Sequence, residues 1–439
     1  MPIKKFTQHL NERLQNEEDA RACKAIEERA CRVVPGNYFL TLISYFFNTL
    51  ADSIANAKVV IPWIMQTLNA PVFLISFLVP IRESGAMLPQ LFIGAYIRQK
   101  PIRKWVWVLG ALLQALTMGG IALVAYTLEG MVAGYAIIAL LLLFSLARGL
   151  SSVAAKDVLG KTIPKKRRGK LTGVSSSFAG LVVIVLGAYL LFVGEKPFSP
   201  ENFAVLLCLA GLCWILAAIF YGNITEYPGE TEGGGNAAAI AIKKISLLKT
   251  DKMFRLFVIS RALFLSSVLS APFFIILAQE YTNSNTYLLG FFILANGLSA
   301  LLSAPFWGNF ADLSSRKVMI VGAMITSVLG VILFCIDLLA PHWFANIWFM
   351  PILYFFLSIG YHGIRVGRKT YVVDMAEGNK RTDYVSVSNT LIGFILLLTG
   401  FVGSLNAIMS ISSIILTLSI VGFIGVYLTY KLPEVQEEE

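Results

Sequence analysis

Charged residues are scarce in this sequence. Asp, Glu, Lys and Arg make up 14% of the 439 residues, against about 25% in an average soluble domain. Too few polar side chains remain to cover the water-exposed surface of a soluble chain of this length, which excludes an ordinary cytosolic enzyme. The hydrophobic share of 56% also excludes a disordered chain, because disorder requires low hydrophobicity.

Residues that build metal and nucleotide sites are scarce as well. The five cysteines include no Cys-x-x-Cys pair, and none stands at metal-ligand spacing from the three histidines. The sequence has no G-x-x-x-x-G-K-[ST] loop, so nothing indicates direct use of ATP. His9, His342 and His362 offer no setting for a catalytic triad. We therefore expect no enzyme activity, no metal, no cofactor and no disulfide.

Long apolar stretches are abundant instead. Twelve of them reach the roughly 20 residues that a helix needs to cross a bilayer. None alternates in the way that the strands of a membrane barrel do. The sequence therefore predicts an all-α membrane protein with twelve transmembrane helices. Their approximate limits are 38–66, 71–97, 104–127, 131–155, 171–193, 202–222, 253–279, 286–311, 316–339, 345–367, 384–405 and 408–430.

The basic residues are sorted to one side of these spans. Of the 36 Lys and Arg residues, 30 lie in the two tails and the even-numbered loops, and Lys196 alone lies in an odd-numbered loop. Cytoplasmic loops carry such an excess, so we expect both termini in the cytoplasm and a location in a bacterial inner membrane. The positive net charge is thus a topological signal and does not indicate nucleic acid. The other five lie within spans: Lys58, Arg82, Arg148, Arg261 and Arg365.

The chain divides into two similar halves. At an offset near 213, Arg168–Ser175 lies over Arg381–Ser388, which indicates duplicated, pseudo-symmetric six-helix halves. Duplication of this kind is expected of secondary transporters, whose solute site lies near the midplane between the halves. The predicted segments are an amphipathic cytoplasmic segment at 1–36, the first half at 37–225, a cytoplasmic linker at 226–252, the second half at 253–431 and an acidic tail at 432–439.

One loop carries a recognisable motif. The segment Gly308-Asn-Phe-Ala-Asp-Leu-Ser-Ser-Arg-Lys317 resembles the G-x-L-a-D-r-x-G-r-k loop motif of the major facilitator superfamily. This resemblance implies alternating access, with the motif acting as a gate at adjoining cytoplasmic helix ends. In the first half, Arg98 stands where the motif has Asp. The gating residues implied are Gly308, Asp312, Arg316 and Lys317 in the second half, and Gly94, Arg98 and Arg103 in the first.

Several charges lie too deep in the spans to reach water without a cavity. Asp52, Arg82 and Glu83 sit at the centres of their spans. A charge there costs at least about 2.5–3.5 kcal/mol, so it needs a polar cavity and partners. Ser44, Asn48, Asp52 and Asn56 recur every four residues and form one polar stripe. Lys58, Arg148 and Arg261 lie roughly 12 Å from their span ends.

Two interpretations of these charges stay open. They form either an ion-pair network that holds the first half together or a site for substrate binding and coupling. If they couple protons, we prefer Glu83 over Asp52, because Arg82 lies where it can balance the charge of Asp52. Arg148 resembles the intramembrane arginine of the superfamily. Arg365 is expected to reach the cytoplasmic interface beside Arg368, and His362 to be a packing residue.

The leading functional prediction is a proton-coupled secondary transporter. The candidate substrate-binding or coupling residues are Asp52, Arg82, Glu83, Asn48, Asn56, Lys58, Arg148 and Arg261. Their surplus of two cations favours an organic anion or an amphoteric metabolite as the substrate. The expected partners are this solute, protons and the lipid bilayer, with no nucleic acid and no obligate protein partner.

Two alternative functions remain. The first is proton-driven efflux of amphipathic or cationic compounds, which the many Phe and Tyr side chains would suit. The fifth span lacks the Gly-Pro element typical of the drug/proton antiporters of the superfamily, which counts against efflux. The second, from another class, is a membrane sensor on the same fold that transports nothing.

Overall fold

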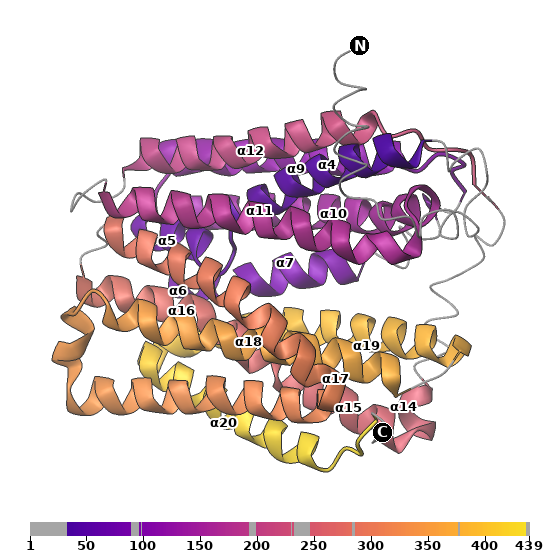
Figure 1. Cartoon of the computed structure of the whole chain (residues 1–439). Coiled ribbons are helices and arrows are strands. Elements are labelled where there is room, and N and C mark those ends of the chain that lie inside the picture. Colours follow the sequence, from indigo (N-terminus) through magenta and orange to yellow (C-terminus); the bar gives the residue numbers. More distant parts are fainter. Residues whose placement is uncertain are drawn as a thin grey trace.

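The computed structural model describes residues 33–88, 96–97, 99–192, 199–229, 231, 246–282, 286–375 and 378–435. Secondary structure in these ranges is helical, and they contain no strand (Figure 1). The all-α prediction is therefore confirmed for the part of the chain that the structure describes. The predicted amphipathic segment at 1–36 and the linker at 226–252 fall largely outside these ranges.

Nine helical segments of the described chain are long and apolar enough to cross a membrane, by length and composition. They are Lys104–Thr127, Gly130–Thr162, Arg167–Phe192, Pro200–Gly222, Lys252–Thr282, Pro305–Leu339, Phe349–Asp374, Val387–Ala407 and Ile411–Tyr430. The three other predicted spans, 38–66, 71–97 and 286–311, coincide with shorter or interrupted helices. The count of twelve thus stays a prediction.

Helices of the first half pack on one another at the top of Figure 1. Here α9 contacts both α10 and α12, α4 contacts α11 and α12, and α7 packs on α10. The helices are α4 (Val34–Ile54), α5 (Val60–Thr67), α6 (Val72–Ile75), α7 (Leu78–Met87), α9 (Lys104–Thr127), α10 (Gly130–Thr162), α11 (Lys165–Phe192) and α12 (Pro200–Gly222).

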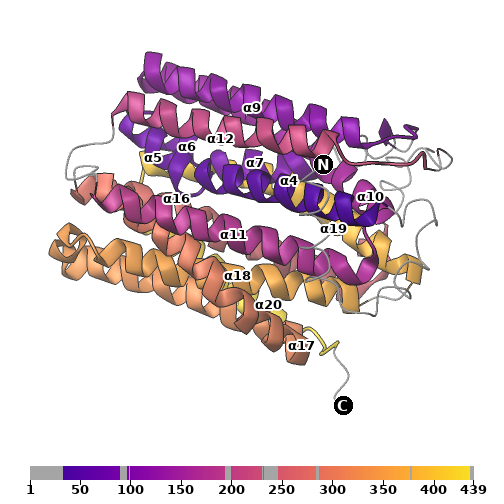
Figure 2. The ribbon, with the colours of Figure 1, turned by 45° about the horizontal axis from the view of Figure 1, so that its top comes forward.

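Helices of the second half form the lower part of the same bundle, which Figure 2 shows from a tilted view. In it, α17 packs against α18 and α20, and α20 contacts α15 and α16. The helices are α14 (Leu247–Thr250), α15 (Lys252–Leu263), α16 (Leu265–Thr282), α17 (Thr286–Leu339), η2 (Pro341–Ala345), α18 (Phe349–Asp374), α19 (Gly378–Thr399), η3 (Gly400–Ala407) and α20 (Ile411–Tyr430).

The prediction of one continuous helix over 38–66 is wrong, because the helix breaks between α4 and α5. The Asn56 side chain lies at this break. Its Oδ1 accepts a hydrogen bond from the Lys58 backbone N–H at 2.8 Å, a local turn that competes with helical hydrogen bonding. The break places Lys58 on a short non-helical segment at the middle of the bundle.

The span predicted at 71–97 is also interrupted, at Ser76 and Phe77 between α6 and α7. The Ser76 hydroxyl contacts two carbonyl oxygens, that of Phe73 at 2.7 Å and that of Gly400 at 2.6 Å. The second contact joins the two halves. In the second half, α15 and α16 meet at Phe264 within the predicted span 253–279, and α17 has an extended backbone at Ser314, between the predicted spans 286–311 and 316–339.

The two halves contact each other along α11 and α17, along α7 and α19, and at one end of the bundle. The start of α4 and the end of α20 lie toward the opposite end, which we call the terminal end (Figure 1). At the other, far end, α6 contacts η3 and α5 contacts α16. Trp63 lies beside Phe292 there, and Phe77 packs edge-on against Phe401. The far end is therefore closed by packing between the halves.

Candidate functional site

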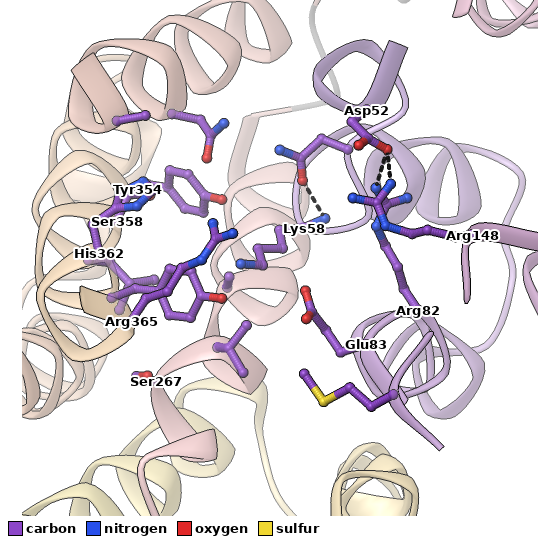
Figure 3. Close-up of a pocket in the computed structure, with 18 of the residues that line it drawn as sticks. Asp52, Lys58, Arg82, Glu83, Arg148, Ser267, Tyr354, Ser358, His362 and Arg365 are labelled. Carbon is purple, nitrogen blue, oxygen red and sulfur yellow. Dashed lines mark hydrogen bonds and ion pairs between the residues drawn. The ribbon is translucent and has the colours of Figure 1, made fainter. Parts of the chain in front are cut away.

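A cavity of about 350 Å³ lies between the two halves. The first half contributes residues from α4, α7, α10 and the break after α4, and the second half contributes residues from α16, α17 and α18. Six charged side chains line it: Asp52, Lys58, Arg82, Glu83, Arg148 and Arg365. Its size suits a small molecule. The side chains point into this space from both walls (Figure 3).

Asp52 lies between two arginines on the first-half wall. Its Oδ1 accepts a hydrogen bond from Arg82 Nη2 at 2.9 Å and forms a closer ion pair with Arg148 Nη1. The Arg82 guanidinium also lies over the Phe144 ring, 5.1 Å from its centroid. Helices α4, α7 and α10 are thus joined through one carboxylate. The cluster carries one net positive charge.

Lys58 reaches across to the other half. Its Nζ lies 3.6 Å from the centroid of the Tyr361 ring on α18, a distance at which an ammonium is attracted to the face of an aromatic ring. The contact with Tyr361 gives Lys58 a partner on the opposite wall. Lys58 owes this position to the break in the helix at Asn56.

Glu83 follows Arg82 on α7 and lines the same cavity. Within the described ranges, no hydrogen bond or salt bridge reaches its carboxylate. Asp52 and Glu83 therefore differ: one is held by two guanidinium groups, and the other faces open space. Of the remaining predicted residues on α4, Asn56 lines the cavity, while Asn48 is half-buried and not among the lining residues.

Arg261 belongs to another place in the fold. It is buried in α15, and its guanidinium donates to Ser388 Oγ at 2.7 Å and Asn389 Oδ1 at 2.8 Å. These bonds fasten α15 to α19, and Arg261 does not line the cavity. The sequence predicted Arg261 from its depth in the span, but one sequence does not show which neighbouring helix a side chain faces.

Arg365 was left out of the predicted site and lies in the cavity. The sequence placed the end of this span at 367, whereas α18 continues to Asp374. Arg365 is therefore about 14 Å from the end of its helix, and it faces the cavity. Tyr354, Ser358 and Tyr361 precede it at helical spacing and also line the cavity. This polar stripe, like that on the first helix, was the signal that could have found it.

His362 lines the cavity as well, although the sequence favoured a packing role. It follows Tyr361 on α18, and Ser267 on α16 and Asn296 on α17 contribute further polar groups to the second-half wall. Polar residues on three helices of the second half thus face the charged cluster of the first half.

The predicted gating motif of the second half lies at the terminal end. Arg316 Nη1 donates to the Leu432 carbonyl at 2.8 Å, and Arg316 Nε lies 3.4 Å from Glu434 Oε2. Ser314 Oγ donates to the same carboxylate oxygen at 2.7 Å and accepts from the Lys317 backbone N–H at 3.1 Å. The motif loop is therefore fastened to the segment that follows α20. Gly308 adjoins open space, and Asp312 is exposed.

The first-half counterpart is held in a similar way. Arg103 forms an ion pair with Asp157, and the Glu226 carboxylate accepts the backbone N–H groups of Arg103 at 2.9 Å and Lys104 at 2.7 Å. Lys161 Nζ lies 3.1 Å from Glu226. Glu226 thus occupies the N-terminus of α9, where a negative charge is stabilised by the helix dipole. Gly94 and Arg98 lie outside the described residues.

Metal-binding groups are not gathered anywhere in the described ranges, where no three His, Cys, Asp or Glu side chains could hold an ion together. Cys208, Cys213 and Cys335 are free thiols. The chemistry that this cavity offers is therefore that of charged side chains, hydroxyls and aromatic rings.

Comparison with protein families identifies the fold. The family model for the Major Facilitator Superfamily matches residues 41–300 and 262–439. The chain belongs to this superfamily. It is accordingly a multi-pass membrane transporter and not an enzyme, as the motif around Asp312 had indicated. No curated protein matches the sequence significantly.

Solved transporters of this fold align with most of the chain. A POT family transporter in complex with a thioalcohol-conjugated peptide has a TM-score of 0.68 at 14% identity, covering 90% of this chain and 94% of the other. A D-xylose–proton symporter gives 0.67 at 13% identity, with 90% and 98% covered. The nucleoside transporter NupG gives 0.67 at 13%, with 90% and 99% covered. At these identities the likeness extends to the fold alone.

Proposed function

We propose that this member of the superfamily is a proton-coupled secondary transporter for a small organic anion or an amphoteric metabolite. Its two six-helix halves would rock around the central cavity, exposing it alternately to either side of the membrane. The charge excess in the loops supports a bacterial inner membrane with both termini in the cytoplasm.

The observation that carries this proposal is the charge of the cavity wall. Lys58, Arg82, Arg148 and Arg365 face only two carboxylates, so the wall carries a surplus of two positive charges. Arginine in particular binds carboxylate and phosphate groups through paired hydrogen bonds. An anionic group on the solute would neutralise charge that is costly to keep within a membrane protein.

Proton coupling rests on the difference between the two carboxylates. Protonating Asp52 would break contacts with two guanidinium groups, whereas protonating Glu83 breaks no hydrogen bond or salt bridge among the described residues. Removing one partner of a buried ion pair is strongly unfavourable. Glu83 is therefore the better candidate for the group that gains and loses a proton during the cycle.

The closed far end indicates the state of the transporter. Packing between Trp63 and Phe292, and between Phe77 and Phe401, closes the cavity on that side. With the termini in the cytoplasm, this is an inward-facing arrangement, and the loops of Asp312 and Arg103 would act as the cytoplasmic gate. The efflux alternative is less well supported, because a cationic compound would meet a positively charged wall.

Proteoliposome flux tests the proposal. A panel of labelled organic acids, amino acids, sugars and organic cations is presented under an imposed pH gradient. We expect concentrative movement of an anionic or amphoteric solute. Failure of every solute to move would refute a transporter of this kind and favour the sensor alternative.

Variants of the two carboxylates then test the coupling. Glu83→Gln should abolish concentrative uptake and retain exchange of solute across the membrane. Lys252→Gln, at an exposed position at the start of α15, serves as the control and should behave as the wild type. Normal accumulation by Glu83→Gln would exclude Glu83 as the coupling group, and the same experiment with Asp52→Asn would then decide for or against Asp52.

A further inference from the structure

Two cations face each other across the cavity, and each comes from a different half. The Lys58 ammonium extends from the break after α4, and the Arg365 guanidinium extends from α18 toward it (Figure 3). Neither side chain forms a hydrogen bond or a salt bridge with any residue that the structure describes. The only described contact of either is that of Lys58 with the Tyr361 ring. This pair differs from Arg82 and Arg148, which share Asp52.

Two like charges in this position are unfavourable without an anion. The Tyr361 ring partly compensates the charge of Lys58, and no described contact gives Arg365 such help. A carboxylate or phosphate between the two would be bound by the paired donors of a guanidinium and by the point charge of an ammonium. The geometry therefore fits one acid group held by both halves.

Glu83 lines the same cavity as this pair, together with Arg82. It also lines a smaller adjoining pocket with Tyr361 and Arg368 of α18. The residues of α16 and α19 that lie beside it, Leu265, Val268, Ile392 and Leu396, are apolar. Glu83 therefore shares the cavity with the same cations that an arriving acid group would contact.

We propose that Lys58 and Arg365 together bind the acid group of the solute, and that its arrival drives a proton from water onto Glu83. This inference rests on the proposed function and assigns its substrate a chemical class, an organic acid or phosphate ester. No covalent bond of the solute changes. The anion brings one negative charge, and the proton neutralises the one on Glu83, so the charge of the cavity with a bound monoanion equals that of the empty one.

The same step links binding to the motion of the halves. In an empty cavity, the repulsion between Lys58 and Arg365 is offset only by Glu83, which belongs to the same half as Lys58. An anion bound between Lys58 and Arg365 instead attracts both walls. Loaded transporter can then close at the terminal end, whereas the unloaded, deprotonated form keeps Glu83 as its only unpaired anion beside the two cations.

Binding of simple anions to the purified, full-length protein in detergent tests the inference. The probes are acetate, succinate and inorganic phosphate, measured by isothermal titration calorimetry at several pH values, with proton uptake followed by an indicator dye in weak buffer. We expect at least one probe to bind, with uptake of up to about one proton per anion. Lys58→Gln and Arg365→Gln should each weaken binding about tenfold or more, and Lys58→Arg and Arg365→Lys should recover part of it.

Glu83→Gln separates the two parts of the inference. This variant should bind the same anion at least as tightly as the wild type, with no proton uptake and no dependence on pH over the range in which the wild type depends on it. Lys252→Gln is the matched control, since it removes an exposed cation far from the cavity, and should bind as the wild type does. Thermal unfolding of each variant shows that it is folded.

The outcomes distinguish this inference from the proposed function. Absence of binding by all three probes, or unchanged binding in both Lys58→Gln and Arg365→Gln, would overturn the subsite. Binding without proton uptake would overturn the link to Glu83. Flux of a neutral or cationic solute that is insensitive to Lys58 and Arg365 would refute the inference and leave transport intact. Anion binding with proton uptake, but no flux of any solute, would instead refute transport.

Discussion

A single methyl group at Gly403 should shift the transporter away from the closed far end. Gly403 lies in η3, where the second half meets α6 of the first. A Cβ added there would lie 2.2 Å from Ser76 Oγ, 2.5 Å from Ser76 Cβ and 3.1 Å from the Phe73 Cα. Only a glycine allows the two chains to approach this closely.

Ser76 cannot easily move out of the way of this methyl group. It is buried, and its hydroxyl contacts the carbonyl oxygens of Phe73 and Gly400. Relief of the clash therefore requires either loss of these contacts or separation of the halves. Overpacking at such a contact costs about 1–3 kcal/mol. The cost applies only when the far end is closed, because the clash lies between the halves.

Gly403→Ala should consequently raise the ratio of far-end-open to far-end-closed molecules roughly 5- to 140-fold, since each 1.4 kcal/mol is a factor of ten. Double electron–electron resonance measures this ratio directly. Spin labels at Glu129 and Asn406 are suitable, because both positions are exposed at the far end and belong to opposite halves. The labels are attached to cysteines introduced into a variant in which the five native cysteines are replaced.

The control for this experiment is Gly119→Ala, where an added Cβ would meet nothing within 4 Å. Its distance distribution should match that of the parent protein. A Gly403→Ala protein that folds normally and shows no increase in long distances would refute the reasoning, because the contact at Ser76 would then not belong to the moving interface.

Three further changes test other parts of the structure. Glu226→Gln removes the charge that accepts the first backbone N–H groups of α9 and should cost about 1.5–3 kcal/mol, seen as a lower midpoint in thermal unfolding; an unchanged midpoint would contradict this. Asn56→Ala removes the side chain that turns the backbone before Lys58, and should weaken anion binding in calorimetry more than it lowers the unfolding temperature. Arg261→Met should leave flux nearly unchanged but lower the unfolding temperature, because Ser388 and Asn389 lose their buried hydrogen-bond donor at a cost of about 1–3 kcal/mol, whereas Arg365→Met should abolish anion flux in proteoliposomes.

Much of the helical organisation could be predicted because it depends on local composition. Stretches such as 104–127 and 202–222 are apolar and long, and the structure has helices there. The interruptions of the helices could not be predicted in the same way. The interruption at Ser76 is accompanied by a contact with Gly400, 324 residues away. The interruption at Asn56 is accompanied by a single side-chain hydrogen bond, which composition does not reveal.

For the site as well, the sequence showed how deep a charge lies in its span but did not show which way its side chain points. Depth along a span identified Asp52, Arg82, Glu83 and Arg148 as charges that need a cavity, and the structure places them in one. Depth alone also admitted Arg261, which faces α19 instead. The sequence predicted a surplus of two cations by counting Arg261. The cavity also has a surplus of two cations, but Arg365 and not Arg261 is the fourth cation in it.

Two carboxylates at the terminal end bear on how the halves move. Glu226 stands four residues after α12, and Glu434 four residues after α20. Each reaches back to the motif loop of its own half, at Arg103 and at Arg316 respectively. This repeated arrangement is what duplication of one half would produce. It also ties the last helix of each half to that half's motif loop, so each half can rotate as a rigid unit. The breaks near Asn56 and Ser76 lie elsewhere, beside the cavity and the far-end contact, and are the places where we expect the chain to bend during that rotation.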